Sequence, residues 1–427
     1  MHENVKKCLS QMTERDFQAL KSIYDYRCLS EQQIYEINYK TSEHLKKPVG
    51  DAYFRTRKFK KWIEWGLIEE GWSYDRNLPP VYFLTTLGVS VIRRAFKFPN
   101  NIYDGKKISV RGYQTAYELK VEEKFIPHQY NLNRFAIELA KISEENGCEY
   151  EYEDERHTSK YTYIRPDGVF YTEACDVFLE MDMGTETEFQ LCEKWNHYRA
   201  FKSSEEFFNK NKPIKIFFIC DNVKNINKRI KLIKKSISTH FIDIIDNNFD
   251  IYVGTHESLI KAFKNSVLRE NITGIKENME LGAILKNQFG LSIGKSEKYE
   301  EILDSKYMFF GKKNDFMFAI DDVSGDALSL INRIHKFNLM SPTFENELNC
   351  NIKYILKVDS VYLSAENIDL FNIIFNGNIL FTTDELLKKA SNFPEALISF
   401  IGPNMTSGQF VDMNFKTYKR VVLDKNI

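Results

Sequence analysis

One stretch of the chain limits its fold more than any other. Residues 214–219 have the sequence Ile-Lys-Ile-Phe-Phe-Ile, a nearly continuous apolar run, and helical patterns lie on both sides of it, over 186–202 and 224–236. Such a run is typical of a buried strand. The surrounding pattern predicts a helix over 132–146 that ends at Gly147. It also predicts further strands over 149–153, 162–166, 168–171, 176–181 and 250–253. This order predicts an α/β domain with a mixed sheet over residues 126–274.

The first hundred residues have a different order of elements. The pattern predicts three helices with suitable start or stop residues: 14–26 after Thr13, 30–37 from Ser30, and a helix from Asp51 that ends at Gly66. Two strands and a fourth helix follow, over 67–72, over 81–84 and from Thr86. Helix, helix, helix, strand, strand is the order of a winged helix-turn-helix, which we predict over residues 10–96.

The charge of this N-terminal part indicates the kind of partner that it binds. The whole chain has 59 Lys and Arg against 60 Asp and Glu, but residues 1–125 alone have 22 against 16. A local excess of positive charge favours binding to a polyanion. A second basic stretch, residues 224–235, has six basic and no acidic residues and is suited to following a phosphate backbone. Each stretch has the alternative of being a solvated helix face.

The third predicted helix concentrates these cations. It carries Arg55, Arg57, Lys58, Lys60 and Lys61, while Phe59, Trp62 and Ile63 are expected to face the core. In a helix-turn-helix this helix lies in the major groove, where such side chains contact phosphates and guanine edges. We therefore predict binding to double-stranded DNA. A protein-interaction module is the alternative.

The rest of the chain bears few functional signals. Residues 97–125 are predicted to be a polar linker, and residues 275–427 a separate small α/β domain of unknown role, with no internal repeat apparent. The seven cysteines form no CxxC pair, which favours reduced thiols. No apolar stretch reaches the length of a membrane span and the start lacks a signal-peptide core, so a cytoplasmic protein without membrane contact is expected.

Three carboxylates mark the end of the predicted sheet. Asp167 precedes one strand, and Glu180 and Asp182 end the next, where residues two apart share a face. If the two strands are neighbours, the three side chains converge, and a cation between them would relieve their repulsion. Hard oxygen ligands suit Mg²⁺ or Mn²⁺, which can activate water against a phosphodiester. The alternative is a Pro-Asp-Gly turn beside two solvated acids.

A helix is predicted directly beyond these acids. Thr185 and Glu188 match a capping box, and Glu186, Gln190, Lys194 and Tyr198 recur every four residues as one polar stripe. From this stripe Glu186 would be an additional ligand, and Lys194 would reach a scissile phosphate or orient water. An ordinary exposed helix face is the alternative.

These motifs resemble two known groups of proteins. Asp167 followed by Glu180-x-Asp182 resembles the PD-(D/E)xK fold of restriction endonucleases, although Asp182 stands where that pattern has lysine, which makes Lys194 the candidate. More specifically, residues 10–255 are similar to the replication-relaxation family. The likeness includes the predicted winged helix, Pro127-His128, Pro166-Asp167, the sequence Glu-Met-Asp-Met-Gly-Thr-Glu at 180–186, and Lys194-x-x-x-Tyr198.

The resemblance implies a plasmid or mobile-element protein, related to mobilisation relaxases, that nicks or processes its own origin. Asp167, Glu180 and Asp182 would hold Mg²⁺ or Mn²⁺, and Glu186 and Lys194 would line the catalytic site. His128 would sit near it, and Glu138 on the following helix would supply a further acid. Partners expected for such a protein are an origin in double-stranded DNA, replication or conjugation proteins, and a second copy in a homodimer. The alternatives are a non-catalytic replication initiator or transcriptional regulator, and a defence nuclease.

Overall fold

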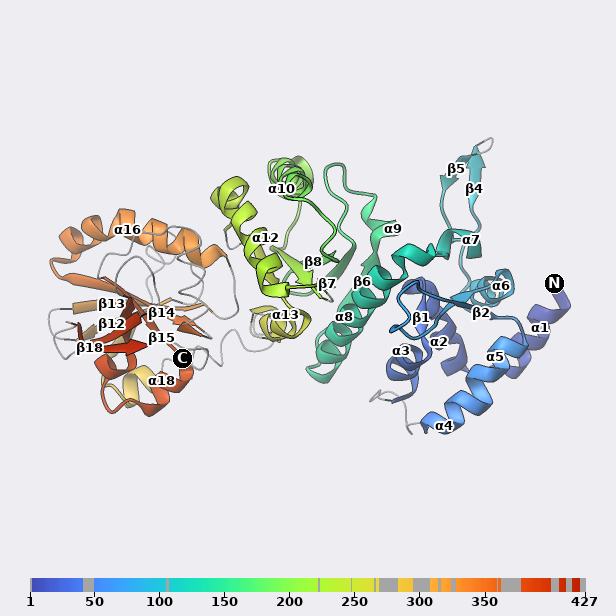
Figure 1. Ribbon diagram of the computed structural model, residues 1–427, viewed down its shortest axis with the longest axis horizontal. Helices are drawn as coiled ribbons and strands as arrows, with labels where there is room; N and C mark the ends of the chain where they lie inside the picture. The colour runs from blue at the N-terminus through green and yellow to red at the C-terminus, as the bar shows by residue number, and fades with distance from the viewer. Residues whose placement is uncertain are drawn as a thin grey trace. The chain divides into compact units, whose positions relative to one another are not determined.

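The computed structural model is a mixed α/β protein, as the sequence predicts (Figure 1). The chain divides into two compact units, Met1–Lys141 and Ile142–Ile427. Among the described residues, no helix has the length and apolar character needed to cross a bilayer. The structure describes residues 2–40, 50–104, 107–221, 223–246, 248–264, 266–268, 283–294, 308–313, 316–323, 328–358, 360–361, 378–400, 407–411 and 417–422.

The first unit starts with helices that are capped where the sequence indicates. After α1 (His2–Gln11), Thr13 caps α2 (Glu14–Asp25) by accepting a hydrogen bond from the amide of Asp16. Ser30 caps α3 (Glu31–Tyr35) in the same way, and a π-helical turn continues α3. These hydroxyl groups pair amides that a helix start otherwise leaves unpaired.

The third predicted helix is present but is turned differently from the prediction. It consists of α4 (Asp51–Tyr53), a π-helical segment (Phe54–Phe59) and α5 (Lys60–Glu64), and Gly66, with φ of +64°, follows its end. Phe59 and Trp62 are buried as predicted, but Ile63 is 46% exposed. A π-helical turn is wider than an α-helical one, so it shifts the residues beyond it around the axis and moves Ile63 off the inner face.

A small sheet completes this arrangement. β2 (Ile68–Gly71) and β3 (Val81–Leu84) form the predicted hairpin, and the short β1 (Leu29–Ser30) pairs with β3. α6 (Thr86–Ala95) follows, with Thr85 as its cap. Helices and strands therefore occur in the order expected of a winged helix-turn-helix.

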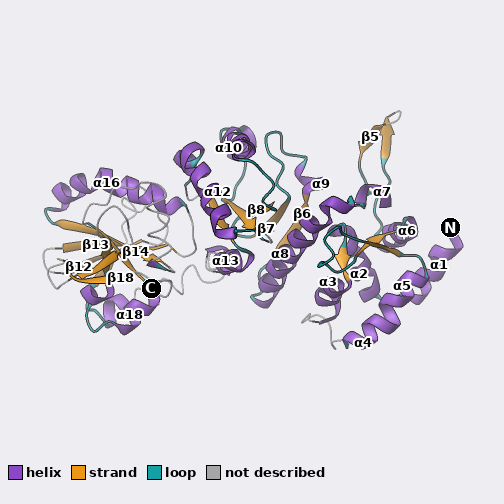
Figure 2. Cartoon of the chain, in the orientation of Figure 1, coloured by secondary structure: helices purple, strands orange, loops and turns teal. Residues whose placement is uncertain are grey.

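Residues 97–125 are not the linker that their polar composition predicts. They contain a two-stranded hairpin, a short helix and a 3-10 turn (Figure 2): β4 (Ile102–Asp104), β5 (Lys107–Val110), α7 (Ala116–Leu119) and η3 (Glu123–Phe125). Thr115 and Glu118 form a capping box at α7, and the amide of Gln114 donates to the hydroxyl of Tyr24 at 2.6 Å. The Thr-x-x-Glu pattern is the sequence signal for this helix.

α8 (Ile126–Glu145) is the predicted helix ahead of the sheet, but it begins at Ile126 rather than at residue 132. Gly147, with φ of +66°, follows its end as predicted. The side-chain amide of Asn133 donates to the carbonyl groups of Tyr26 and Cys28, at 3.0 and 2.6 Å. These bonds tie the first half of α8 to the end of α2.

The second unit contains the predicted mixed sheet. Its strands are β6 (Tyr150–Asp154), β7 (Gly168–Thr172), β8 (Asp176–Asp182), β9 (Ile214–Cys220) and β10 (Phe249–Gly254), in the spatial order β10-β9-β8-β7-β6. β6, β7 and β8 are antiparallel neighbours, whereas β8, β9 and β10 are parallel. The strand predicted over residues 162–166 is a loop instead. The amide of Thr162 donates its hydrogen bond to the carboxylate of Glu206 and not to a neighbouring strand.

Two helices cover one face of this sheet, where the candidate site lies (Figure 1). They are α10 (Glu188–Lys202) and α12 (Ile226–His240), and the indole of Trp195 donates to Ser236 Oγ at 2.8 Å between them. The other face bears α13 (His256–Ala262). Short helices α9 (Glu155–Thr158) and α11 (Glu205–Phe208) and the turn η4 (Ile242–Ile244) join the remaining elements.

α10 begins two residues later than predicted. Thr187 and Gln190 form the capping box, and not Thr185 and Glu188. The segment contains both Thr-x-x-Glu and Thr-x-x-Gln in overlapping positions, so the sequence pattern cannot choose between them. Glu186 consequently precedes the helix instead of starting its polar stripe.

A second sheet occupies the C-terminal region. Its strands lie in chain order: β11 (Ser292–Gly294), β12 (Met308–Lys313), β13 (Phe316–Val323), β14 (Asn351–Val358), β15 (Ile379–Thr382), β16 (Ile398–Phe400), β17 (Ser407–Val411) and β18 (Thr417–Val422). The helices here include α16 (Ser329–Leu348) and α18 (Asp384–Lys389). The buried carboxylate of Asp250 on β10 accepts from the amide and the hydroxyl of Ser329, at 3.1 and 2.7 Å. The domain boundary predicted at residue 274 lies outside the described residues.

Candidate active site

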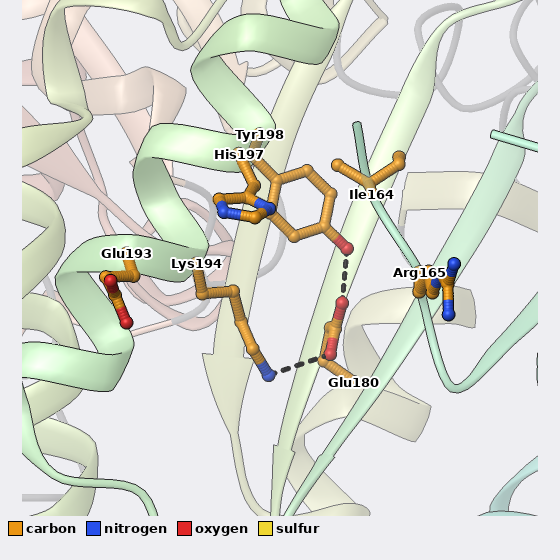
Figure 3. Close-up of a pocket in the computed structure, with 7 residues that line it drawn as sticks. All are labelled: Ile164, Arg165, Glu180, Glu193, Lys194, His197 and Tyr198. Carbon is orange, nitrogen blue, oxygen red and sulfur yellow. Dashed lines mark hydrogen bonds and ion pairs between the residues drawn. The ribbon is translucent and has the colours of Figure 1, made fainter. Parts of the chain in front are cut away.

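Glu180 is the centre of the candidate site. It lies on β8 and is 3% exposed, and its carboxylate accepts hydrogen bonds from two side chains of α10 (Figure 3). Lys194 Nζ lies 3.0 Å from Oε2, and the hydroxyl of Tyr198 donates to Oε1. Lys194 and Tyr198 are four residues apart on one helix, so they reach the same carboxylate from one face.

Asp167 lies beside Glu180 because the two strands are neighbours, as predicted. β7 and β8 pair with Gly168 opposite Leu179, which brings the residue before β7 next to Glu180. Asp167 Oδ2 accepts from the backbone amide of Met181 at 2.7 Å. The structure thus joins two of the three predicted acids with the predicted lysine.

Lys194 supplies the positive charge that these acids need. Its ammonium group contacts Glu186 Oε1 at 2.9 Å as well as Glu180, and Asp167 contributes a third favourable charge. Burial by itself would lower the pKa of Lys194, but the three carboxylates outweigh that effect and raise the pKa above its usual value. Lys194 is therefore protonated at any physiological pH.

Glu180 is the group of this cluster that titrates near neutrality. Burial raises its pKa from 4.5 to about 7; Lys194 opposes the rise, and the charge of Asp167 adds to it. Burial also raises the pKa of Tyr198 well above its usual value, and the neighbouring Glu180 adds to the effect. A carboxyl group with a pKa close to the working pH is suited to accepting and donating protons.

A cavity of about 240 Å³ opens beside Glu180. Its lining consists of Ile164, Arg165, Glu180, Glu193, Lys194, His197 and Tyr198 (Figure 3). Arg165 and His197 are site residues that sequence reasoning missed, and they add a guanidinium and an imidazole group to the cavity in which Glu180 is the buried acid. Their signals are simple: Arg165 precedes Pro166-Asp167, and His197 is three residues after Lys194 on α10. Arginine and lysine are the usual partners of a phosphate group, and in this cavity they lie together with two acids, Glu180 and Glu193.

Asp182 does not join this cluster, which corrects the prediction of three converging carboxylates. It shares the α10 and α12 face of β8 with Glu180, as alternation requires, but it meets a different helix. Arg229 of α12 binds both of its oxygens, with Nε and Nη2 each at 2.7 Å, and Arg229 Nη1 donates to the carbonyl of Glu186 at 2.7 Å. The Asp182–Arg229 pair therefore holds α12 and the loop before α10 in place. Because Arg229 occupies both of its oxygens, Asp182 is not available as a metal ligand.

The donors fit a divalent cation only in part. Among the described residues, no three His, Cys, Asp or Glu side chains lie together in a way that could hold a metal ion. Asp167 and Glu180 form a pair of hard oxygen donors, and Glu186 Oε2 is buried without a hydrogen-bond partner. Lys194 Nζ, between Glu180 and Glu186, already supplies one cation to these oxygens.

The cations of the α4 to α5 helix divide into two sets. Arg55, Arg57 and Lys60 are exposed and Lys61 is half-buried over the Trp65 ring. Lys58 instead points inward and binds the buried carboxylate of Asp16 at 2.9 Å. Lys58 therefore stabilises this unit, while the other four remain at least partly exposed, and Arg55 among them pairs with Asp51 at 3.0 Å.

The remaining predicted residues lie on helices. His128 is in the first turn of α8 instead of before it, and Glu138 is near its middle. Residues of the second basic stretch lie on α12, where Lys228, Lys231 and Lys235 are exposed at helical spacing. Arg229 and Lys234 of the same stretch are buried.

Fold and site together define an α/β domain with an acid and lysine pocket, preceded by a basic helical unit. Residues 20–215 match the model of the family described as Replication-relaxation, whereas no curated protein and no solved structure matches the chain. Over these residues the chain is similar to the replication-relaxation family, which confirms the resemblance found in its sequence. The matched segment includes Asp167, Glu180 and Lys194. This similarity indicates a function connected with replication or mobile elements.

Proposed function

We propose that this protein is a cytoplasmic DNA-processing protein of a plasmid or mobile element, which binds its origin and cuts a phosphodiester bond in the Glu180 pocket. The observation that carries the proposal is the buried Glu180 carboxylate, shared by Lys194 and Tyr198 and adjacent to Asp167, at the wall of a cavity with cationic side chains. Because the chain is similar to the replication-relaxation family, we take a phosphate of DNA as the ligand of this cavity.

Each pocket residue has a defined task in this proposal. Arg165 and His197 bind the phosphate oxygens, and Lys194 keeps the Glu180 carboxylate in place and faces the developing negative charge. Glu180 has a pKa of about 7 in the absence of a divalent cation, and its carboxylate orients the attacking water by accepting a hydrogen bond from it. Tyr198 orients Glu180 through its hydroxyl.

Asp167 and Glu180 would hold the divalent cation as a pair of oxygen donors. A bound Mg²⁺ or Mn²⁺ supplies polarisation of the phosphodiester and a lower pKa for water. Asp182 is left out of this set because Arg229 occupies both of its oxygens. The proposal thus needs two of the predicted acids and the lysine, and it leaves Asp182 out.

DNA binding is proposed for the first unit. Arg55, Arg57, Lys60 and Lys61 lie on the helix that a winged helix-turn-helix places in the major groove. The exposed lysines of α12 would contact further phosphates. Replication or conjugation proteins and a second copy of the chain are the other proposed partners.

Cleavage of supercoiled plasmid carrying the element's own origin tests the proposal. With Mg²⁺ or Mn²⁺, the wild type should produce open circles, and Glu180→Gln and Asp167→Asn should reduce the rate by at least about 100-fold, since each removes a charged group of the site. Asp243→Asn is the matched control, because Asp243 is an exposed acid paired with Arg199 on the same domain. No cleavage of any origin-bearing plasmid by folded wild type would defeat the proposal.

A second candidate is a non-catalytic DNA-binding initiator or regulator. The observation that favours it is Lys194 Nζ, which already neutralises Glu180 and Glu186 without a metal ion. Titration with Mn²⁺, followed by electron paramagnetic resonance, separates the two functions. The nuclease requires a site that Glu180→Gln weakens, while the regulator binds origin DNA equally well with and without that substitution and with no such site.

A further inference from the structure

We infer that the C-terminal region is a second copy of the central domain that has lost part of its site, so that the chain cuts one DNA strand and not both. This inference rests on the proposed function for its last step only. Its first step is structural and concerns two modules. The first module, residues 150–262, runs from β6 to the end of α13, and the second module, residues 292–390, runs from β11 to the residue after α18.

The two modules have the same strand order and the same strand directions. In the first, β6, β7 and β8 are antiparallel, and parallel strands β9 and β10 follow on the other side of β8. In the second, β11, β12 and β13 are antiparallel, and parallel strands β14 and β15 follow on the other side of β13. α10 joins β8 to β9 as α16 joins β13 to β14, and α13 follows β10 as α18 follows β15.

Sequence similarity accompanies the last strand and helix of each module. Residues 251–262 are Ile-Tyr-Val-Gly-Thr-His-Glu-Ser-Leu-Ile-Lys-Ala, and residues 379–390 are Ile-Leu-Phe-Thr-Thr-Asp-Glu-Leu-Leu-Lys-Lys-Ala, so six of the twelve positions are identical. The fifth position is the helix cap in both: Thr255 accepts from the amide of Ser258, and Thr383 from the amide of Leu386. Leu259 and Leu387, at the ninth position, are both buried.

Strand register provides an independent check of this alignment. Ile251 pairs with Ile216 on β9, and its counterpart Ile379 pairs with Tyr354 on β14. Ile216 should therefore correspond to Tyr354. The residues before them agree, because residues 214–215 and 352–353 are both Ile-Lys. A register taken from hydrogen bonding and an alignment taken from sequence thus give the same equivalence.

Packing agrees with the same equivalence on both faces. Phe217 and Tyr252 contact each other on the α13 face, and their counterparts Ile355 and Leu380 share a core cluster with Leu387 of α18. On the opposite face, Ile216 belongs to the core under α10, and its counterpart Tyr354 stacks on Phe337 of α16, with ring centroids 4.8 Å apart. Corresponding helices therefore cover corresponding faces.

The register also locates the site positions in the second module. Phe178 pairs with Ile216 and Ala319 with Tyr354, so Glu180 corresponds to Asp321. Val169 pairs with Phe178 and Phe310 with Ala319, so Asp167 corresponds to Met308. The second module keeps an acid at one position but has methionine at the other, and α16 contains no tyrosine to match Tyr198.

One module with a complete set of groups gives one cut. A duplex has two antiparallel strands, so breaking both requires two competent sites or two binding events. With a single complete site, hydrolysis of one phosphodiester by one water leaves a phosphate and a hydroxyl end on one strand, and the other strand stays intact. The expected product is a nicked circle.

The test compares two variants of the full chain on supercoiled plasmid. Glu180→Gln should abolish cutting, and Asp321→Asn should leave the nicking rate within about twofold of wild type, with open circles accumulating before any linear DNA. Linear DNA as the first product, converted to open circles by either substitution, would overturn the inference. If the wild type cuts nothing, the proposed function fails, and a crystal structure of the chain still decides the duplication: strands β11 to β15 in another order or register would refute it.

Discussion

Lys194 Nζ lies 3.0 Å from Glu180 Oε2 and 2.9 Å from Glu186 Oε1, so one ammonium group joins a strand, a loop and a helix. The carboxylates of this site would repel each other without a cation. Lysine meets this requirement within the chain, and any metal ion must share its ligands with Lys194. The ammonium group of Lys194 therefore stabilises the site in the absence of a ligand. The stability of the domain should consequently depend on Lys194 and on each carboxylate that it contacts.

Lys194→Met should destabilise the second unit. Lys194 is only 25% exposed, and its removal leaves the buried Glu180 without its cation, which costs roughly 2 to 4 kcal/mol of unfolding free energy. Urea unfolding at pH 7.5 measures the loss. Lys389→Met is the control, because its ion pair with Glu385 is exposed and should contribute less than about 1 kcal/mol. Equal losses in both variants would contradict the role assigned to Lys194.

Glu180→Gln should flatten the pH dependence of stability. The folded-state pKa of Glu180, about 7, lies above its usual 4.5, so the native state binds this proton more tightly than the unfolded state. Its stabilising contribution is therefore complete below pH 4.5 and is lost as the pH rises through 7. The shift corresponds to about 3 kcal/mol.

Urea unfolding of both proteins at several pH values between 5 and 8 measures this difference. Wild type should lose more unfolding free energy over that range than Glu180→Gln, which has no proton to release. Glu385→Gln, at an exposed position, should follow the wild type. Parallel curves for wild type and Glu180→Gln would show that Glu180 does not titrate in this range.

Much of this site could be predicted because it depends on local patterns. Alternation along β8 placed Glu180 and Asp182 on one face, and helical spacing placed Lys194 and Tyr198 together. The sequence could not tell which helix each acid meets. Arg229 reaches Asp182 from α12 across the sheet face, 47 residues along the chain, and a charge run does not reveal which of its members is buried.

The fold could likewise be predicted where it depends on local interactions, and not where it depends on residues far apart in the chain. Thr13, Ser30, Gly66 and Gly147 predicted helix ends, because caps depend on neighbouring backbone groups alone. The duplication escaped sequence reasoning because only the strand and helix after Ile251 and Ile379 retain visible similarity, while the rest of the correspondence exists in strand register.

Arg229→Met should lower the stability of the fold more than removal of an arginine from an exposed ion pair does. It leaves the buried Asp182 carboxylate without its two guanidinium bonds, which costs roughly 3 to 5 kcal/mol. Arg199→Met is the control, since Arg199 and Asp243 are both more than one third exposed. Thermal unfolding of the two variants gives the comparison. Asp182→Asn in the Arg229→Met background should recover part of the loss, because the uncompensated charge is gone; no recovery would mean that Arg229 acts through packing alone.

Lys58 and Lys60 offer the sharpest test of the DNA surface, because they are two residues apart on one helix and have different surroundings. Lys60 is exposed, so Lys60→Ala should leave the unfolding free energy within about 0.5 kcal/mol and should lower the salt dependence of origin binding by about one unit of slope. Lys58→Ala leaves the buried Asp16 without its ion pair and should cost roughly 2 to 3 kcal/mol of stability, with the salt slope unchanged. Fluorescence anisotropy with labelled origin DNA at increasing salt, together with urea unfolding, measures both quantities. The reverse pattern, with Lys58 setting the salt slope and Lys60 the stability, would mean that the inner and outer faces of this helix have been assigned the wrong way round.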